Sequence, residues 1–423
     1  MECPETSWTD DIPRCRRTGV GTSSNETLSR HRFHALEDRA FHFRLTGMSF
    51  FGVLDGFSGC KMSDFASKKM PAEVCLGQID PSTSDESIKE VLKAAFISSD
   101  RDYFESLNES LARALTHNKK TSPESFSSDS GSSATIGVLL DDSRLFIANA
   151  GDTGALLISK KNEDTDKEHD LKNFNIVKLS IDHVLGVNED EELRLQHLGL
   201  EPHNLKKVLG GPRGYTRCLG YHRAKSGYFK EEELLLKNAK GVPVLCEPEI
   251  HGSIQVGSDS YFLLIYSRPL MDTMMELWDE EDGVDLDKEL ARLVYEEFES
   301  NVTVTGVAQS VVDKIVRLHK DKFEDDVNRF REDITLLVHN LNCDLGSLPS
   351  RSRSKSRSSS TREDTTFKAI HTSTTTESSD MLSKQGIESL PVDNFGRILP
   401  YVDFSYYNAE WSNHLELTNV TTE

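Results

Sequence analysis

SATIGVLLDDSRLFIANAGDTGALLI, residues 133–158, decides the expected fold. Three apolar runs in this stretch are separated by two short turns that are rich in Asp, Ser and Gly. Apolar runs of strand length that are joined by turns this short pair as adjacent antiparallel strands. The stretch is therefore expected to form a three-stranded meander, with strands at 133–140, 145–149 and 155–158.

Further strand patterns, together with helix patterns, lie on both sides of this meander in the sequence. Predicted buried strands cover 49–54, 261–267 and 334–338, and predicted helices cover 88–115 (one long helix or two consecutive ones), 286–298 and 307–318. Helices that are grouped apart from antiparallel strands indicate an α+β layered domain, not a doubly wound parallel sheet.

Composition and charge exclude several functional classes. The 423 residues carry a formal net charge of -21, which opposes binding to nucleic acid or to an anionic membrane. No apolar run approaches the roughly 18 residues of a membrane span, and the N-terminus MECPETSWTDDIPR has no signal-peptide core. Seven cysteines without a Cys-x-x-Cys pair indicate reduced thiols, so the expected location is cytoplasmic.

Only part of the chain has the composition of a packed domain. About half of residues 347–384 are Ser or Thr, and few are apolar. Such a stretch cannot bury enough apolar surface to offset the conformational entropy that is lost when a chain becomes ordered. Within this stretch, basic and hydroxyl residues alternate at 351–357. This pattern is interpreted either as a patch for phosphorylation or nucleic-acid binding, or as a solvated linker with no such role. The expected segments are a flexible N-terminus (1–31), the α+β domain (32–343), a disordered Ser/Thr-rich linker (344–398), a short helix (399–415) and a tail (416–423).

Acidic residues at strand ends are candidates for metal ligands. Asp55-Gly56 ends the predicted strand at 49–54, where a carboxylate is held in place and glycine lets its own carbonyl approach an ion. Glu37-Asp38 and Glu332-Asp333 could supply further oxygens. Two divalent ions that share a water nucleophile would hydrolyse a phosphoester. Taken alone, an Asp-Gly pair at a strand end is more often a turn.

Six short elements between residues 51 and 335 carry a family resemblance. They are FGVLDGFSG at 51–59, SGSSAT at 130–135, NAGDT at 149–153, DH at 182–183, EPEIH at 247–251 and EDIT at 332–335. In this order they resemble the motifs of the metal-dependent serine/threonine phosphatases of the 2C type. The resemblance implies a four-layer αββα sandwich, followed here by the linker and the short helix.

The departures from that family pattern point away from catalysis. The family's ligand Asp-Gly after the strand at 261–267 is replaced by Arg268-Pro269, and the last ligand is kept only as Glu332. At about 4 Å and an effective dielectric near 20, each unit charge interaction is worth about 4 kcal/mol, so exchanging Asp for Arg expels at least one metal ion. The resemblance therefore implies no catalytic residue and no cofactor.

A vestigial site is expected at Glu37, Asp55, Gly56 and Glu332, with Arg268 in place of a ligand Asp. Because the Asp55-Gly56 pair is retained, weak binding of Mg²⁺ or Mn²⁺ stays open. One hypothesis pairs the Arg268 guanidinium with Asp55. The alternative makes Arg268 a surface residue on a rearranged loop.

Aromatic residues gather near the C-terminus in PYVDFSYYNAEW, residues 400–411. If Pro400 opens a helix, Tyr401, Phe404, Tyr407 and Trp411 fall on one face. An aromatic face after a disordered linker suits a helix that binds in the groove of a partner protein. The alternative is a helix that folds back on its own domain.

This segment carries a second resemblance, to the kinase-binding end of scaffold proteins for a transforming-growth-factor-β-activated kinase, a MAP kinase kinase kinase. The matching residues are Pro400, Tyr401, Val402, Phe404, Tyr407 and Trp411. Such scaffolds combine an inactive 2C-type domain, a Ser/Thr-rich linker and this motif. The resemblance implies an adaptor that binds and activates the kinase catalytic domain, with further kinases or adaptors on the phosphatase-like domain. The competing interpretation is an active Mg²⁺- or Mn²⁺-dependent protein phosphatase with atypical ligands.

Overall fold

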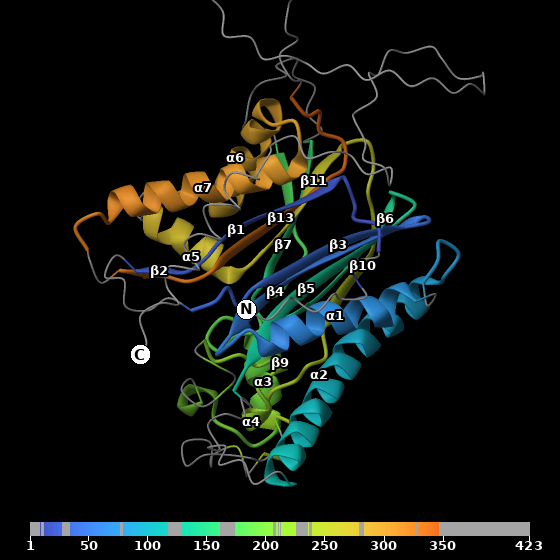
Figure 1. The fold of residues 1–423 in the computed structure, drawn as a ribbon, viewed down its shortest axis with the longest axis vertical. Coiled ribbons are helices and arrows are strands. Elements are labelled where there is room, and N and C mark those ends of the chain that lie inside the picture. The colour runs from blue at the N-terminus through green and yellow to red at the C-terminus, as the bar shows by residue number, and fades with distance from the viewer. Residues whose placement is uncertain are drawn as a thin grey trace, which may run out of the picture. The chain divides into compact units, whose positions relative to one another are not determined.

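Two antiparallel sheets face each other between two layers of helices (Figure 1). The computed structural model describes residues 9, 12–27, 34–76, 79–116, 129–160, 174–205, 209, 211, 213–225, 236, 239–278, 283–326 and 329–346. One apolar core lies between the sheets and one lies between each sheet and its helices. The predicted α+β, four-layer αββα sandwich is confirmed.

The first sheet has the strand order β10 (Glu249–Gln255), β6 (Arg144–Ala150), β5 (Gly131–Leu140), β4 (Met48–Phe57) and β3 (Arg39–Leu45), with β9 (Leu219–Gly220) paired to β5. Helices α1 (Lys61–Cys75) and α2 (Asp85–Thr116) pack against this sheet. The predicted helical stretch 88–115 is thus a single helix.

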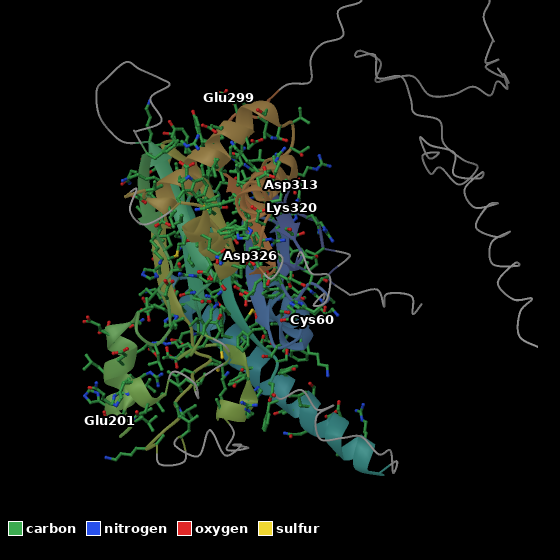
Figure 2. All side chains as sticks on the ribbon, turned by 90° about the vertical axis from the view of Figure 1, so that its left-hand side faces the viewer. Cys60, Glu201, Glu299, Asp313, Lys320 and Asp326 are labelled. Atoms are coloured by element: carbon green, nitrogen blue, oxygen red, sulfur yellow. The ribbon has the colours of Figure 1, made fainter. Side chains whose placement is uncertain are left out.

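The second sheet has the order β1 (Thr18–Ser23), β13 (Ile334–Asn340), β11 (Ser260–Tyr266), β7 (Gly154–Lys160) and β8 (Phe174–Lys178). Its outer face is covered by α5 (Arg268–Leu277), α6 (Leu286–Ser300) and α7 (Val304–Lys322). Two short strands, β2 (Glu26–Thr27), which follows β1 in the sequence, and β12 (Phe330–Arg331), which precedes β13, pair with each other as a separate two-stranded sheet. Glu299, Asp313 and Lys320 mark this helical layer in Figure 2.

A smaller group of elements follows β8. It contains α3 (Glu189–His197), the 3-10 turn η3 (Pro202–Asn204) and α4 (His222–Lys225), with an apolar core of its own. Glu201 lies in this group, at the end of the domain opposite Glu299 (Figure 2). Among the described helices, none is long and apolar enough to cross a membrane.

The predicted meander is only half correct. β5 and β6 form the expected hairpin, but β7 belongs to the opposite sheet. The turn at 151–153 carries the chain across, and Gly151 there has a φ of +104°, a conformation that favours glycine. A Cβ on Gly151 would also overlap the side chain of Ser133. The turn therefore places Asp152 between the two sheets' ends.

The predicted flexible N-terminus is wrong where the structure describes it. Residues 18–23 form β1, which pairs with β13 along its whole length. The domain also extends beyond residue 343, because the Gly346 N–H donates to the carbonyls of Phe298 and Asn301. The predicted linker from residue 347 onward, the helix at 399–415 and the tail lie outside the described residues.

A buried lysine ties α2 to the segment around α4. The Lys225 ammonium lies 2.7 Å from Asp100 Oδ1 and donates to the Cys218 carbonyl at 2.6 Å. The side chains of Lys225 and Asp100 are 8% and 9% exposed. The same Asp100 oxygen accepts the Gly220 N–H at 2.6 Å, so one carboxylate fixes both β9 and α4.

A histidine lies in the core between the two sheets. The His339 ring stacks on Phe51 with ring centroids 4.7 Å apart, and its Nδ1 shares a 2.8 Å hydrogen bond with the Thr18 hydroxyl. Its Nε2 has no partner among the described residues. Burial, with the nearby Arg17 charge, lowers the pKa of His339 to about 3. The folded domain thus favours the neutral ring.

We expect the domain to lose stability as the pH falls below about 6.5, the unfolded pKa of histidine, and to continue losing it toward pH 3. At pH 4.5 the protonation of His339 on unfolding is expected to have lowered the free energy of unfolding by about 3 kcal/mol, because each pH unit below 6.5 is worth about 1.4 kcal/mol. Urea unfolding at pH 7.5 and 4.5 measures it. His339→Gln should flatten the pH dependence, whereas His197→Gln, an exposed control, should not. Equal slopes for the unaltered chain and His339→Gln would contradict this assignment.

Candidate functional site

Carboxylates from three parts of the chain meet at one end of the sandwich. Glu37 and Asp38 precede β3, Asp55 lies near the end of β4, and Asp333 precedes β13. Together with Gly56 and Glu332 they line a cavity of about 100 Å³. The structure therefore brings together the residues of the predicted vestigial site, Glu37, Asp55, Gly56 and Glu332.

Four of the carboxyls at this end are almost fully buried: Asp38, Asp55, Asp152 and Asp333. Burial raises the pKa of Asp38 to about 7, with the Asp333 carboxylate as a further cause. Burial also raises the pKa of Asp55 well above its ordinary value, and Asp38 and Asp152 add to the rise. The pKa of Asp152 rises to about 6 by burial, although Arg213 and Arg268 oppose the rise. Asp38, Asp55 and Asp152 therefore hold their protons more tightly than exposed carboxyls do.

Arg268 reaches Asp55 through its backbone and not through its side chain. Its N–H donates to Asp55 Oδ2 at 2.9 Å. The guanidinium instead lies 2.8 Å from Asp272 and 3.4 Å from Asp182. The hypothesis of an Arg268–Asp55 ion pair is therefore wrong. The cause is that Arg268 opens α5, which directs its N–H into the site and its side chain along the helix toward Asp272, four residues on.

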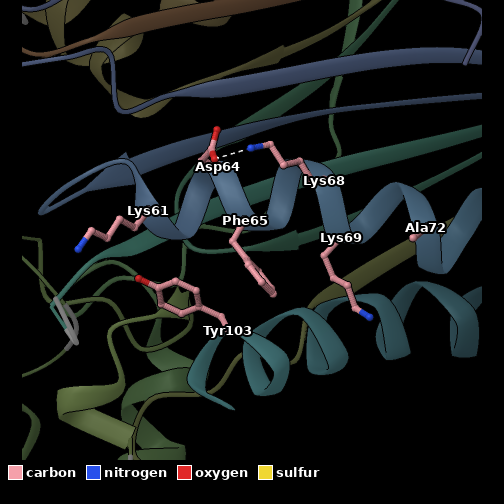
Figure 3. A pocket seen from close by; sticks show the side chains of 7 residues that line it. All are labelled: Lys61, Asp64, Phe65, Lys68, Lys69, Ala72 and Tyr103. Carbon is pink, nitrogen blue, oxygen red and sulfur yellow. Dashed lines mark hydrogen bonds and ion pairs between the residues drawn. The ribbon is translucent and has the colours of Figure 1, made fainter. Parts of the chain in front are cut away.

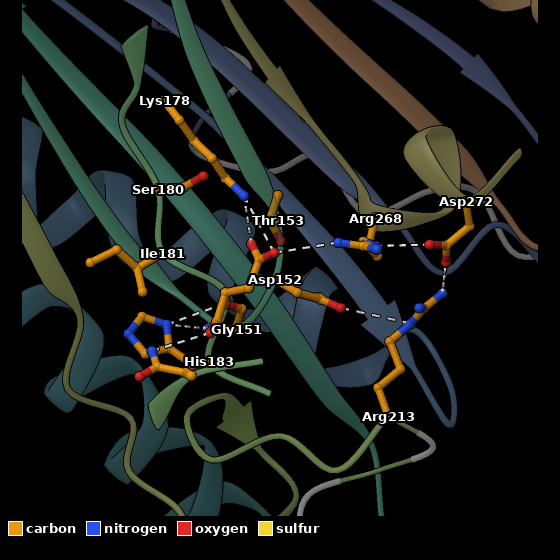
Figure 4. A network of polar contacts seen from close by, with 12 residues as sticks. Gly151, Asp152, Thr153, Lys178, Ser180, Ile181, His183, Arg213, Arg268 and Asp272 are labelled. Atoms are coloured by element: carbon orange, nitrogen blue, oxygen red, sulfur yellow. Dashed lines mark hydrogen bonds and ion pairs between the residues drawn. The ribbon is translucent and has the colours of Figure 1, made fainter. Parts of the chain in front are cut away.

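Arg213 is a cation at the site that the sequence analysis missed. Its guanidinium lies 2.5 Å from Asp272, 3.1 Å from Glu332 and 3.8 Å from Asp152. Figure 4 shows the contacts with Asp272 and Asp152. It comes from the glycine-rich run GGPRG at 210–214, which carries no recognised motif. The feature of the sequence that could have indicated it is a single arginine among glycines, shortly before Leu219-Gly220.

Aromatic rings close another wall of the cavity. Phe57 stacks on Tyr215 with centroids 4.9 Å apart. Tyr221 packs against Phe57 at 5.9 Å. These three rings belong to one apolar cluster.

The carboxylates do not fit a pair of divalent ions as they stand. Asp333 accepts the N–H groups of Asn25 and Glu37 at 2.6 and 2.7 Å, and Glu37 accepts the Gly59 N–H at 2.9 Å. Asp55 accepts a hydrogen bond from the Arg268 N–H, and Glu332 accepts one from the Arg213 guanidinium. Within the described ranges, no group of three or more His, Cys, Asp or Glu side chains is placed to hold a metal ion.

A larger hollow of about 450 Å³ lies between α1 and α2 (Figure 3). Phe65 and Tyr103, whose ring centroids are 5.5 Å apart, line it beside Lys61, Lys68 and Lys69. Lys68 pairs with Asp64 at 2.8 Å, and Lys69 pairs with Glu73 and Asp102 at 2.8 Å each. Because these two lysines are neutralised within the domain, the hollow lacks a converging set of free polar groups.

The kinase-binding residues predicted from the sequence are not located by the structure. Pro400, Tyr401, Val402, Phe404, Tyr407 and Trp411 all lie outside the described residues. Their role stays a prediction.

Comparison with known proteins agrees with the sandwich fold. The model of the family described as Protein phosphatase 2C matches residues 26–315. The chain belongs to the protein phosphatase 2C family.

A curated relative is TGF-beta-activated kinase 1 and MAP3K7-binding protein 1 of Caenorhabditis elegans, which is 24% identical over 213 residues. That match covers 49% of this chain and 47% of the relative, so it spans about half the length of each.

Two solved structures are also similar. Serine-threonine phosphatase 2C from Toxoplasma gondii has 13% identity and a TM-score of 0.49, with 77% of this chain and 96% of that chain covered. A C. elegans sex determining protein has 19% identity and a TM-score of 0.45, with 76% and 65% covered.

Proposed function

We propose that this chain is a catalytically inactive phosphatase-like adaptor that binds and activates a MAP kinase kinase kinase of the transforming-growth-factor-β-activated type. The observation that carries the proposal is its similarity to a relative whose name is that of a kinase-binding protein, within a family otherwise named for phosphatases. The kinase catalytic domain is the proposed partner, and the cytoplasm the proposed location.

The contacts at the acidic end of the sandwich support the inactive part of the proposal. A metal-dependent phosphatase needs free carboxylate oxygens to hold its ions. Here Asp55 and Asp333 are engaged by N–H groups of the chain itself, and Glu332 by the Arg213 guanidinium. The domain is proposed to need no metal and to serve as a scaffold, with other kinases or adaptors as further partners.

The aromatic segment at 400–411 is the proposed contact with the kinase. On a helix, Tyr401, Phe404, Tyr407 and Trp411 would form one face that enters a hydrophobic groove. Binding activates a kinase only if the segment has a higher affinity for the active conformation than for the inactive one. Activation is therefore proposed to follow from that difference in affinity.

An active phosphatase with atypical ligands is the second candidate. One observation favours it: the buried Asp38 lines the cavity, and its Oδ2 has no hydrogen-bond partner of good geometry among the described residues. A carboxylate oxygen in this position is available to an ion. Asp55-Gly56 beside it retains the family's sequence.

One experiment with two readouts separates the candidates. The purified chain is tested for hydrolysis of a phosphoserine peptide with and without Mn²⁺, and both the chain and a peptide of residues 386–423 are tested for capture of the kinase catalytic domain. The adaptor proposal expects no hydrolysis under either condition and capture by both. Mn²⁺-dependent hydrolysis that Asp55→Ala abolishes would establish the phosphatase instead, and failure of both to capture the kinase would refute the adaptor.

A further inference from the structure

The acidic end of the sandwich carries a positive charge supplied by the chain. The Arg213 side chain is 27% exposed and contacts Asp272, Glu332 and Asp152 at 2.5, 3.1 and 3.8 Å. In Figure 4 the guanidiniums of Arg213 and Arg268 both point to Asp272. An arginine stays charged at any pH at which the protein is folded, so this positive charge is permanent.

The two arginines differ in which of their groups faces the cavity. Arg213 lines it together with Glu37, Asp38 and Asp55. Arg268 contributes its N–H to Asp55, while its guanidinium extends to Asp182 and Asp272. Arg213 therefore shares the cavity with the buried acids as a permanent cation, whereas His34, which also lines the cavity 3.7 Å from Glu37 and 3.9 Å from Asp333, is charged only when it is protonated.

The cavity nevertheless keeps an unused ligand atom. Asp38 is 2% exposed and receives one hydrogen bond, from the Gly56 N–H to Oδ1 at 3.3 Å. Its Oδ2 has no partner of hydrogen-bonding geometry among the described residues, although the hydroxyls of Thr335 and Ser267 lie near. A buried carboxylate oxygen without a donor is costly unless a cation or a proton compensates it.

We propose that Arg213 is a built-in counter-ion that keeps divalent cations out of this cavity, and that removing its guanidinium opens a site for Mn²⁺ around Asp38 and Asp55. The guanidinium excludes the ion in two ways. It repels a second positive charge, and it holds Glu332 and Asp272 in ion pairs that withdraw their oxygens. Once it is removed, these oxygens and Asp38 Oδ2 become available to a hard cation.

This inference rests on the proposed lack of catalysis at the same site, but it is tested by metal binding and not by activity or kinase capture. Mn²⁺ is titrated into the intact chain and the bound ion is measured by electron paramagnetic resonance. Arg213→Gln is the main variant because it removes the positive charge and the ion pairs with Asp272 and Glu332 while it keeps a polar side chain at this position. Arg213→Lys keeps the charge. Arg292→Gln is the matched control, since Arg292 also lies between two glutamates, Glu289 and Glu296, away from the cavity.

We expect Arg213→Gln to gain a saturable site that binds Mn²⁺ roughly tenfold or more tightly than the unaltered chain does. Arg213→Lys and Arg292→Gln should resemble the unaltered chain. Adding Asp55→Asn to Arg213→Gln should remove the new site. Equal Mn²⁺ affinity in the unaltered chain and in Arg213→Gln would overturn the proposal.

Circular dichroism and thermal unfolding establish whether each variant folds. If Arg213→Gln is unfolded without metal and recovers its fold in Mn²⁺, the ion has replaced the guanidinium, as the proposal requires. If it stays unfolded in Mn²⁺, no ion can replace the guanidinium, and the proposal fails. Kinase capture by the variants is not altered by either result, so a failure here is distinguishable from a failure of the adaptor proposal.

Discussion

Phe404→Ala is expected to abolish capture of the kinase catalytic domain and to leave the thermal unfolding of the phosphatase-like domain unchanged. On the helix proposed for this segment, Phe404 would be the central member of the aromatic face formed by residues 401–411. Removing a central aromatic anchor commonly costs 2 kcal/mol or more, which weakens binding by roughly 30-fold or more. Titration of the kinase catalytic domain by isothermal calorimetry measures the loss.

Tyr406→Ala is the matched control for this prediction. It removes an aromatic ring from the same segment, but at 100° per residue Tyr406 points to the opposite side of a helix from Phe404. We expect it to bind the kinase as the unaltered chain does. Equal losses for the two variants would mean that the segment does not bind as a helix, and an unchanged affinity for Phe404→Ala would remove this segment from the interface.

Lys225→Met is expected to lower the free energy of unfolding by about 3–5 kcal/mol, the usual result of leaving a buried charge without its partner. The Asp100 carboxylate would keep the Gly220 N–H but lose the ammonium at 2.7 Å. Burial lowers the pKa of Lys225, but Asp100 and the neighbouring thiols together raise it by more than burial lowers it. The net pKa lies above the ordinary value, so the lysine is charged in the folded domain. Urea unfolding followed by circular dichroism measures the change.

Two further variants test the cause of that loss. Lys68→Met removes a lysine whose side chain is 51% exposed and paired with Asp64, and its stability should stay close to that of the unaltered chain. Adding Asp100→Asn to Lys225→Met removes the orphaned charge and should restore part of the lost stability. A single variant Lys225→Met as stable as the unaltered chain would show that the buried pair does not hold α4 to α2.

The central strands were predictable because they are buried on both faces. β4 and β5 lie in the middle of their sheet, between α1 and the second sheet, so nearly every side chain in them is buried. Such strands appear in a sequence as continuous apolar runs. The antiparallel pairing of β5 with β6 also followed from the short turn between them.

β1 was not predictable in this way. Its sequence TGVGTS contains one large apolar side chain, Val20, and two glycines. The glycines are required because a Cβ on Gly19 or Gly21 would overlap the backbone of α7 at Val304 or Ala308. A strand shaped by the close approach of a helix carries no apolar periodicity, so its sequence resembles a loop.

The acidic residues of the site were found from their positions at strand ends, whereas the cation was not. Asp55 and Glu332 lie beside runs whose strand character is evident. Arg213 lies in an irregular segment, and only tertiary structure brings it to within 3.1 Å of Glu332. The side-chain direction of Arg268 was also unpredictable, since it depends on α5 beginning at that residue.

The place of β1 determines which pieces of this chain can be handled in solution. β1 is the edge strand of its sheet, and β13 is its neighbour. A fragment that begins at residue 32, the boundary that composition favours, would expose the N–H and C=O groups of β13 over six paired residues. Unpaired strand edges of this kind recruit other chains and aggregate. Fragments for crystallisation or binding studies should therefore begin before Thr18, with any tag placed ahead of the strand.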